Sequence, residues 1–418
     1  MIDLCSQDTN PLLSLPEALA RIRAALLPAA GSEKVALKNA LGRTLTQPVY
    51  SPINIPHERN AAMDGYALAA SDIAPNQPFS LHLADTSWAG RPFQGQLQPG
   101  ECIRIFTGAV LPEQADTVIM QERVRADGQT IHFPAQARPY QNVREIGEDI
   151  RQGACLIASP KKLTAADLGL LASAGVCEIT VKRRLNIAFF STGDELTALG
   201  QALQSGKIYD SNRYILSGLL ADPGYSIADK GVIADDRDKL EENLVEAAKN
   251  YDVIITTGGA SVGEADFVKD VLASCGQVNF WKIAMKPGKP LAFGKIGNCY
   301  FFGLPGNPVA VIATFDQLVK PALKQLAGEP FTKPLRLTAV CTSPLKKAAG
   351  RQEFQRGILT QSDAGELLVA SSGKQGSHLL GSFSRANCYI ILPADCTGVE
   401  AGEQVTVEPF SLYCVGID

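Results

Sequence analysis

The sequence predicts a multidomain α/β protein organised around a central three-layer α/β domain with a mostly parallel sheet. Strand, turn and helix patterns alternate along residues 185–328, which is typical of a parallel sheet covered by helices. The stretches 51–143 and 329–418 instead hold short apolar runs between Gly and Pro turns, which favours β-rich domains. A chain of 418 residues also exceeds the length over which one hydrophobic core usually grows.

Four domains account for these patterns. Residues 1–50 and 144–184 form an N-terminal α/β linker domain, and a Pro-rich passage leads from its first part into an inserted β-rich domain, residues 51–143. Residues 185–328 form the α/β domain. Residues 329–418 show no helical period and form a C-terminal β-barrel-like domain.

The composition indicates a globular protein with no nucleic-acid partner. Hydrophobic residues make up 45% of the chain and charged residues 20%, and a net charge of −4 gives no general attraction for nucleic acid. No apolar run reaches the roughly 18 residues of a membrane span, and no signal-peptide pattern is present, so we expect a cytoplasmic protein. The ten cysteines form no CxxC pair, which argues against a zinc or iron–sulfur site.

Helices are expected in three places before residue 185. Apolar residues recur at helical spacing in 15–27, which predicts an amphipathic helix. The segment 35–45 resembles a second short helix that ends near Gly42. Thr164 and Asp167 have the spacing of an acidic capping box, which predicts a helix that begins after Thr164.

The stretch 251–266, YDVIITTGGASVGEAD, is the most informative in the chain. It reads as a buried strand, a turn with two glycines and a helix start, an arrangement that exposes backbone N–H groups to an anion. Gly258, Gly259 and Ser261 would line this turn, and Asp266 would open the helix. Alternatively, the segment is an ordinary tight turn between a strand and a helix. It matches neither the dinucleotide-binding nor the P-loop motif.

Other strands of the same domain end in similar turns. Because the turns that follow parallel strands gather at one edge of a sheet, side chains far apart in sequence are expected to converge there. These side chains belong to Glu195, Asp235, Ser261, Asp266, Pro305 and Asn307. A loop with Lys282, Lys286 and Lys289 lies between the last two strand-turn-helix units.

This edge would suit a phosphorylated substrate bound with Mg²⁺. Carboxylates such as Glu195, Asp235 and Asp266 are the hard oxygen ligands that Mg²⁺ prefers, and each is a candidate metal ligand. Glycine N–H groups and lysines suit the anionic phosphate. No Ser-His-Asp or Cys-His arrangement is visible, so a covalent intermediate is not indicated. The residues alone therefore predict a Mg²⁺-assisted enzyme acting on a phosphorylated small molecule.

Further candidates lie outside the α/β domain. Asp64 precedes a glycine in a small, apolar neighbourhood of the inserted domain, and Thr107 follows a predicted strand. Asp149 lies in a turn flanked by glycine. Arg356 and Ser377 lie between strands of the last domain. Each could equally be an ordinary turn residue or a solvated surface group.

Five motifs together resemble the MoeA-type molybdopterin molybdenumtransferases, a family that includes the catalytic domain of gephyrin. The resemblance covers nearly the whole chain, and the motifs occur in the family's order. They are AMDGYA at 62–67, STGDEL at 191–196, TTGGASVGEAD at 256–266, MKPGKP at 285–290 and GLPGNPV at 303–309.

The resemblance implies a function in molybdenum cofactor biosynthesis. The enzyme would insert molybdate into adenylylated molybdopterin and release AMP, with Mg²⁺ required. It would be a homodimer whose active site lies between the α/β domain of one subunit and the inserted domain of the other. A molybdopterin adenylyltransferase and proteins of molybdoenzyme maturation would be its protein partners.

The resemblance also implies roles for individual residues. Asp266, Glu195 and Asp235 would handle the metal and the substrate phosphate beside Gly258, Gly259 and Ser261. Lys282 and Lys286 would meet the anionic substrate or molybdate, and Pro305 and Pro308 would shape the pocket wall. Asp64, Thr107 and Asp149 would complete the cleft, and Arg356 and Ser377 would hold an oxyanion.

Two other functions stay open at this stage. The first is adenylylation of molybdopterin with ATP, although relatives that catalyse this step usually consist of a single α/β domain. The second is a non-catalytic scaffold or binding protein of the gephyrin type. Consumption of ATP without molybdate would indicate the first, and an inert protein that binds a receptor-type peptide would indicate the second.

Overall fold

The computed structural model describes residues 12–234, 236–258 and 267–410, and these fall into two compact units. The first unit comprises residues up to 33, residues 42–44 and residues from 181 onward. The second comprises residues 34–41 and 45–180. None of the helices in the described ranges is both long and apolar enough to cross a membrane.

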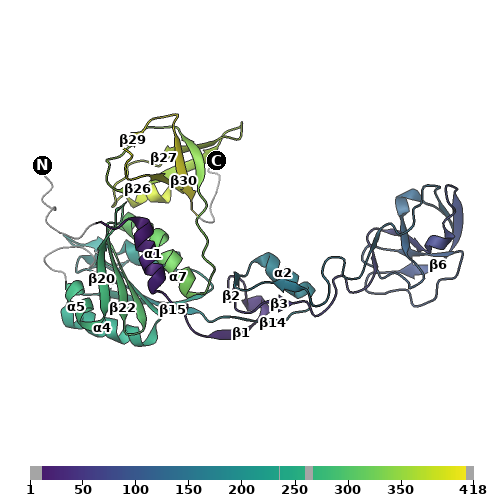
Figure 1. Ribbon diagram of the computed structural model, residues 1–418, viewed down its shortest axis with the longest axis horizontal. Coiled ribbons are helices and arrows are strands. Elements are labelled where there is room, and N and C mark those ends of the chain that lie inside the picture. The colour runs from purple at the N-terminus through teal and green to yellow at the C-terminus, as the bar shows by residue number, and fades with distance from the viewer. Residues whose placement is uncertain (1–11, 235, 259–266, 411–418) are drawn as a thin grey trace. The chain divides into compact units, whose positions relative to one another are not determined.

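The first unit is built on a six-stranded sheet of order β18-β15-β19-β23-β22-β20. Its strands β15, β20 and β22 are labelled in Figure 1. The first four strands are mutually parallel, and β22 is antiparallel to both of its neighbours. The strands are β15 (Leu185–Thr192), β18 (Tyr225–Ile233), β19 (Val253–Thr257), β20 (Gln277–Lys282), β22 (Pro290–Ile296) and β23 (Cys299–Leu304). The predicted mostly parallel sheet is therefore confirmed.

Helices cover both faces of this sheet, because its central strands are apolar on both sides. Ile187 and Phe189 of β15 face a core shared with α1, α3, α6 and α7, whereas Ala188 and Phe190 face α4 and α5. The helices are α1 (Leu15–Ala25), α3 (Ser211–Leu219), α4 (Arg237–Asn250), α5 (Phe267–Cys275), α6 (Pro308–Thr314) and α7 (Lys320–Leu326). A π-helical turn, η4 (Phe315–Val319), joins α6 to α7. The result is the expected three-layer domain.

The C-terminal part of the first unit is a closed barrel of five strands, as β26 pairs with both β27 and β28. Its strands are β24 (Leu337–Cys341), β26 (Gln352–Gln361), β27 (Leu367–Ser371), β28 (Cys388–Leu392) and β30 (Gln404–Pro409). Two further short strands, β25 (Leu345–Lys346) and β29 (Gly398–Val399), pair beside it. The prediction of no helix here was wrong in one place, because α8 (Leu380–Ser384) follows β27.

The inserted part of the second unit is a six-stranded sheet of order β8-β5-β7-β6-β10-β9. These strands are β5 (Gly65–Leu68), β6 (Phe79–Ser87), β7 (Glu101–Ile105), β8 (Thr117–Met120), β9 (Arg125–Asp127) and β10 (Thr130–Phe133). The chain enters and leaves this sheet through antiparallel pairs, β3 (Val49–Tyr50) with β12 (Cys155–Ile157) and β4 (Asn60–Ala61) with β11 (Val143–Arg144). The expected β-rich inserted domain is thus present.

The rest of the second unit holds a small sheet and one helix. The sheet has the order β1-β14-β2-β13, from β1 (Ser32–Ala36), β14 (Glu178–Lys182), β2 (Thr44–Leu45) and β13 (Lys161–Lys162). The helix predicted after Thr164 is α2 (Ala165–Ser173), and both bonds of the Thr164–Asp167 capping box form. The helix predicted in 35–45 was wrong, because this segment continues β1 and then makes only a 3₁₀ turn, Leu37–Asn39.

Candidate active site at the carboxyl edge of the sheet

The three central parallel strands end side by side. Thr257 at the end of β19 pairs with Ser191 of β15 and with Leu304 of β23. Thr192 donates its hydroxyl to the Thr257 carbonyl at 3.2 Å. Gly258 then turns with φ +89°, and a Cβ there would lie 2.6 Å from the Thr192 carbonyl oxygen, which only glycine avoids. The predicted strand-glycine turn is therefore packed directly against the turn that follows β15.

That neighbouring turn carries Glu195. Its side chain is exposed, and its carboxylate lies over Gly193, which has φ +137°. The next residues form β16 (Leu196–Thr197), which pairs with β17 (Ile208–Tyr209) and brings the chain back to the edge at Asp210. Glu195 and Asp210 therefore lie near the start and at the end of the connection between β15 and α3.

Asp210 is a buried carboxylate at the start of α3. Its Oδ1 accepts a hydrogen bond of 3.1 Å from the Arg213 N–H and so caps the helix. Its Oδ2 is buried and has no hydrogen-bond partner among the described residues. This oxygen can therefore accept a hydrogen bond from water or bind a polar or cationic ligand.

Asn212 ties this helix start to the turn after β23. Its Nδ2 donates a hydrogen bond of 2.7 Å to the Gly306 carbonyl, and its Oδ1 is buried without a partner in the described part of the chain. Pro305 before this turn is buried, and Pro308 after it is half-buried at the start of α6. The predicted wall residues Pro305 and Pro308 therefore lie at the same edge as Asp210.

The lysine loop leaves the same edge and reaches the barrel. Lys282 ends β20 and is half-buried, whereas Lys286 is exposed and lies in β21 (Met285–Lys286), which pairs with β26. The Lys286 Nζ is 2.9 Å from Oε1 of the buried Glu353. Gly288 packs so closely on α6 that a Cβ would lie 2.4 Å from the Thr314 hydroxyl. The loop is therefore fixed between α6 and the barrel.

Arg356 holds a loop of the barrel that contacts α6 through Ser377. The Arg356 side chain is 1% exposed, and its guanidinium donates to the carbonyls of Lys374, Gln375 and Gly376 and to the Ser382 hydroxyl. These bonds hold the loop before α8. The Ser377 carbonyl at the end of that loop accepts a hydrogen bond of 3.2 Å from the N–H of Val309 in α6.

A cationic cavity of about 430 Å³ opens beside Ser377. Lys374, His378 and Arg385 contribute its polar lining, together with backbone and side-chain atoms of 379–382. Lys374 and Arg385 carry positive charge, whereas most of the exposed lining is apolar. Neither Lys374 nor Arg385 was among the predicted site residues.

The predicted residues of the second unit form their own arrangement. Asp64 Oδ1 accepts two hydrogen bonds from Thr107, at 2.8 Å from the backbone N–H and at 2.7 Å from the hydroxyl. These bonds, the backbone one first, lower the pKa of Asp64, so the side chain is a carboxylate at neutral pH. Asp149 is exposed, and its N–H bonds the Ile55 carbonyl at 3.0 Å on the strand pair that leads to the inserted sheet.

Four of the predicted site residues lie beyond the part of the chain that the structure describes. Asp235, Gly259, Ser261 and Asp266 lie outside the described residues. Within the described ranges, no three His, Cys, Asp or Glu side chains are grouped closely enough to hold a metal ion. Glu195 is the one predicted metal ligand that the structure describes.

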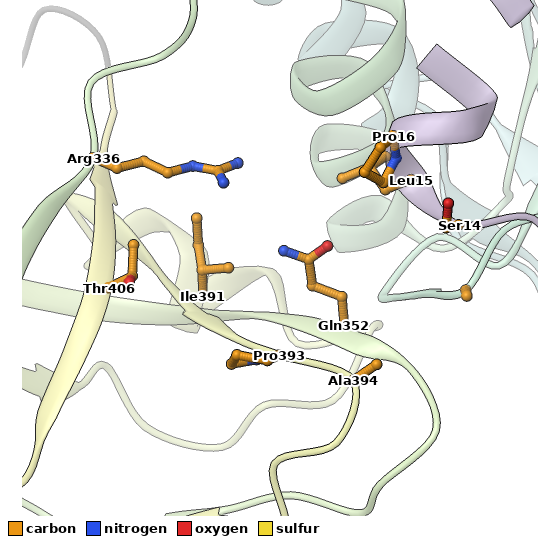
Figure 2. Close-up of a pocket in the computed structure, with 10 residues that line it drawn as sticks. Ser14, Leu15, Pro16, Arg336, Gln352, Ile391, Pro393, Ala394 and Thr406 are labelled. Atoms are coloured by element: carbon orange, nitrogen blue, oxygen red, sulfur yellow. The ribbon is translucent and has the colours of Figure 1, made fainter. Parts of the chain in front are cut away.

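A second cavity, of about 350 Å³, lies between the start of α1 and the barrel (Figure 2). Arg336, directly before β24, and Gln352, at the start of β26, point into it opposite Leu15 and Pro16 of α1. No predicted site residue lines this cavity. The candidate site therefore rests on the sheet edge, and not on this second cavity.

The sequence analysis missed Asp210 and Asn212. Their signal was present, because an aspartate directly before a helical run is a common N-cap. That signal predicts a cap and no more. Only the structure shows that the second oxygen of Asp210 is buried without a partner among the described residues and that Asn212 reaches the turn after β23.

Comparison with protein families covers the chain in three consecutive matches. Residues 13–175 match the MoeA N-terminal region, domains I and II. Residues 188–325 match a probable molybdopterin binding domain, and residues 338–410 match the MoeA C-terminal region, domain IV.

Similar proteins and structures agree with these matches. A molybdopterin molybdenumtransferase from Haemophilus influenzae is 45% identical over 96% of this chain and 99% of its own length. Gephyrin from Dictyostelium discoideum is 31% identical over 89% of this chain and 58% of its own length. A crystal structure of a MoeA protein from Pyrococcus horikoshii superposes with a TM-score of 0.82, at 28% identity over 96% of this chain and all of the other.

Proposed function

This chain belongs to the MoeA family of molybdopterin molybdenumtransferases, and from that premise we propose that it inserts molybdate into adenylylated molybdopterin with release of AMP. It is an enzyme of molybdenum cofactor biosynthesis. A water oxygen would attack the phosphoanhydride of the substrate, so that AMP leaves and the pterin keeps its own phosphate. The two dithiolene sulfurs would bind molybdenum while one molybdate oxygen leaves as water with the two thiol protons. Molybdate is a substrate in this reaction.

One observation supports the position of the reaction more than any other. The hydrogen bond from Asn212 to Gly306 joins the start of α3 to the turn after β23 that contains Pro305. The unpaired Oδ2 of Asp210 lies at the same helix start. Buried oxygen atoms without protein partners are what a bound cation or a polar substrate group would satisfy. The unpaired oxygens of Asp210 and Asn212 at this edge could therefore bind such a ligand.

Mg²⁺ fits this edge. The unpaired oxygens of Asp210 and Asn212 are hard oxygen donors, and the exposed carboxylate of Glu195 lies directly before β16, the strand that pairs with β17 ahead of Asp210. We propose that Glu195 holds the ion together with Asp235 and Asp266. A bound Mg²⁺ would neutralise the phosphate charge as AMP departs.

The lysine loop and the barrel would receive the anions. Lys286 is held by Glu353 against β26, and Lys282 ends the strand before this loop. The cavity with Lys374 and Arg385 lies at the loop that Arg356 fixes. We propose that Arg356 positions Ser377, and that the side chains around this loop hold the molybdate oxyanion.

We further propose that the active protein is a cytoplasmic homodimer. Asp64 and Thr107 of one subunit, with Asp149, would complete the site that the α/β domain of the partner begins. This assignment follows the family, and the ionised carboxylate of Asp64, aligned by Thr107, supports it. A molybdopterin adenylyltransferase would deliver the substrate, and proteins of molybdoenzyme maturation would receive the product.

The reaction is tested with purified protein, adenylylated molybdopterin, Mg²⁺ and molybdate, and AMP is measured by chromatography. We expect AMP release that depends on molybdate and stops when Mg²⁺ is chelated. ATP consumption without molybdate would instead identify an adenylyltransferase. Absence of AMP release under all conditions would refute the proposed function.

The shared site is tested by mixing two inactive variants, Glu195→Gln and Asp64→Ala. In a heterodimer of the two, one site keeps both native residues, so the mixture should regain up to about a quarter of the wild-type rate if subunits exchange randomly. Native mass spectrometry would verify the exchange. A mixture that exchanges subunits but stays inactive would show that each site is built within one subunit.

A further inference from the structure

An aromatic stack lies beside the Asp64–Thr107 pair in the inserted sheet. The parallel pairing of β6 with β7 aligns Ser87 with Ile105, so that Trp88 and Phe106 follow side by side. Their ring centroids are 4.3 Å apart with an interplanar angle of 15°. Phe106 thus covers one face of the indole, yet Trp88 remains 46% exposed. The exposed indole of Trp88 therefore lies against Phe106, the residue directly before Thr107.

The stack is held rigidly. Trp88 and Arg91 exchange two backbone hydrogen bonds of 3.0 Å across a tight turn, in which Gly90 adopts φ +79°. The fully buried Ser87 hydroxyl donates to the Val110 carbonyl at 3.0 Å and so fixes this turn to the loop after β7. A preorganised ring loses little conformational entropy when a second ring stacks on it.

Polar groups accompany the stack. The Arg104 guanidinium lies 5.1 Å from the Phe106 ring centroid and 4.9 Å from that of Tyr66, and it also donates to Gln121. Asp64 directs Oδ1 to Thr107, while its Oδ2 accepts no hydrogen bond within the described residues. An open aromatic face and an available carboxylate oxygen therefore occur together.

We propose that Trp88 stacks on the pterin ring of the substrate while Asp64 accepts hydrogen bonds from the ring's donor edge, an assignment that rests on the proposed function. Stacking on an aromatic side chain suits any planar heterocycle, so Trp88 by itself would serve the pterin or the adenine of the adenylylated substrate. The carboxylate distinguishes them. The 2-amino-4-oxo edge of a pterin presents two adjacent N–H donors, whereas adenine presents one amino group between acceptors.

Fluorescence tests this assignment without relying on turnover. The chain has two tryptophans, so Trp281→Phe leaves Trp88 as the sole reporter. Titration of this variant with 6-hydroxymethylpterin should quench its emission saturably, with a Kd below about 1 mM. AMP should leave the emission unchanged. Quenching by AMP alone, or by neither compound, would overturn the assignment.

The same variant with Asp64→Asn separates stacking from edge recognition. An amide presents an N–H donor where the carboxylate accepts, so the pterin affinity should fall about tenfold. The Trp88 emission before titration should stay the same, which verifies that the stack is intact. An unchanged pterin affinity would remove Asp64 from the proposed contact.

Steady-state kinetics tests whether the Trp88–Phe106 stack contributes to the reaction. Trp88→Ala should raise the KM for adenylylated molybdopterin by about 5- to 150-fold, the range expected for loss of one stacked ring, and Trp88→Phe should restore most of it. Tyr50→Ala, which truncates another exposed aromatic residue of the same unit, is the matched control and should leave KM unchanged. A wild-type protein that releases AMP while Trp88→Ala keeps its KM would refute this inference and leave the proposed function standing.

Discussion

The side-chain amide of Asn212 donates a hydrogen bond of 2.7 Å to the carbonyl of Gly306, 94 positions further along the chain. Through this bond the start of α3 and the turn after β23 become one surface. The neighbouring Asp210 contributes a buried oxygen with no partner in the described structure. These contacts bring together two turns that are remote in sequence.

The first prediction concerns Asp210, whose Oδ1 caps α3 while its Oδ2 has no partner among the described residues. Asp210→Asn keeps an oxygen that can cap α3 but removes the charge, so stability should stay within about 0.5 kcal/mol while AMP release falls at least tenfold. Asp210→Ala loses the cap as well and should cost about 0.5–2 kcal/mol of unfolding free energy. Urea unfolding and the AMP assay measure both effects. Full activity in the Asn variant would reduce Asp210 to a helix cap.

Lys286 and Glu353 offer the second prediction. Lys286→Met leaves the buried Glu353 carboxylate with the Gln355 amide but without its cation, which should cost about 1–3 kcal/mol of stability. The KM for molybdate should rise about tenfold or more, because a charge-assisted contact is lost.

The double variant Lys286→Met/Glu353→Gln separates these two effects. Removing the stranded charge should restore most of the lost stability, and the molybdate KM should stay high. Thermal melts and steady-state kinetics on the two variants provide the comparison. If the double variant regains the wild-type KM, Lys286 serves the fold and does not bind the anion.

Arg183 and Asp252 predict a pH dependence of stability. The Arg183 guanidinium donates two hydrogen bonds of 2.7 Å to the Asp252 carboxylate. The same carboxylate also accepts a hydrogen bond of 2.8 Å from the Asn186 N–H. Burial raises the pKa of Asp252, but the Arg183 and Asn186 hydrogen bonds outweigh it and the pKa is lowered. The stabilisation is therefore present above the unfolded pKa, about 3.9, and is lost as pH falls through the lower folded value.

Asp252→Asn should accordingly cost about 1.5–3 kcal/mol at neutral pH and much less at the acid end. Urea unfolding from neutral to acid pH measures this difference between the wild type and the variant. Two parallel stability curves would contradict the prediction, since they would show that protonation of Asp252 does not contribute.

Much of the fold could be predicted from the sequence because its signals are local and repeated. Apolar runs such as 253–255 mark strands buried on both faces, and Thr164 with Asp167 marks a helix start. The helix predicted in 35–45 was wrong because the helical spacing there competes with pairing of β1 to β14, which is remote in sequence. The antiparallel strand β22 was not predicted, because the loop before it is rich in Pro and Gly and hides the start of the strand.

The candidate site divides in the same way. Glycine turns and acids after strands point to the sheet edge, and the pairing of Thr257 with Ser191 and Leu304 confirms that these turns are neighbours. Asp210, Asn212 and Trp88 could not be predicted as site residues, because their roles depend on one long-range hydrogen bond and on strand register. No local pattern encodes either of these relationships.

The most direct measurement is a single-turnover assay of AMP release by Glu195→Gln, in which the amide keeps the shape of the side chain but removes the charge that a metal requires. Glu246→Gln on the exposed face of α4 is the matched control. The account predicts an unchanged melting temperature, a rate reduced at least a hundredfold that excess Mg²⁺ partly restores, and a control equal to the wild type. A folded Glu195→Gln protein that releases AMP at the wild-type rate would contradict the assignment of the reaction to this edge.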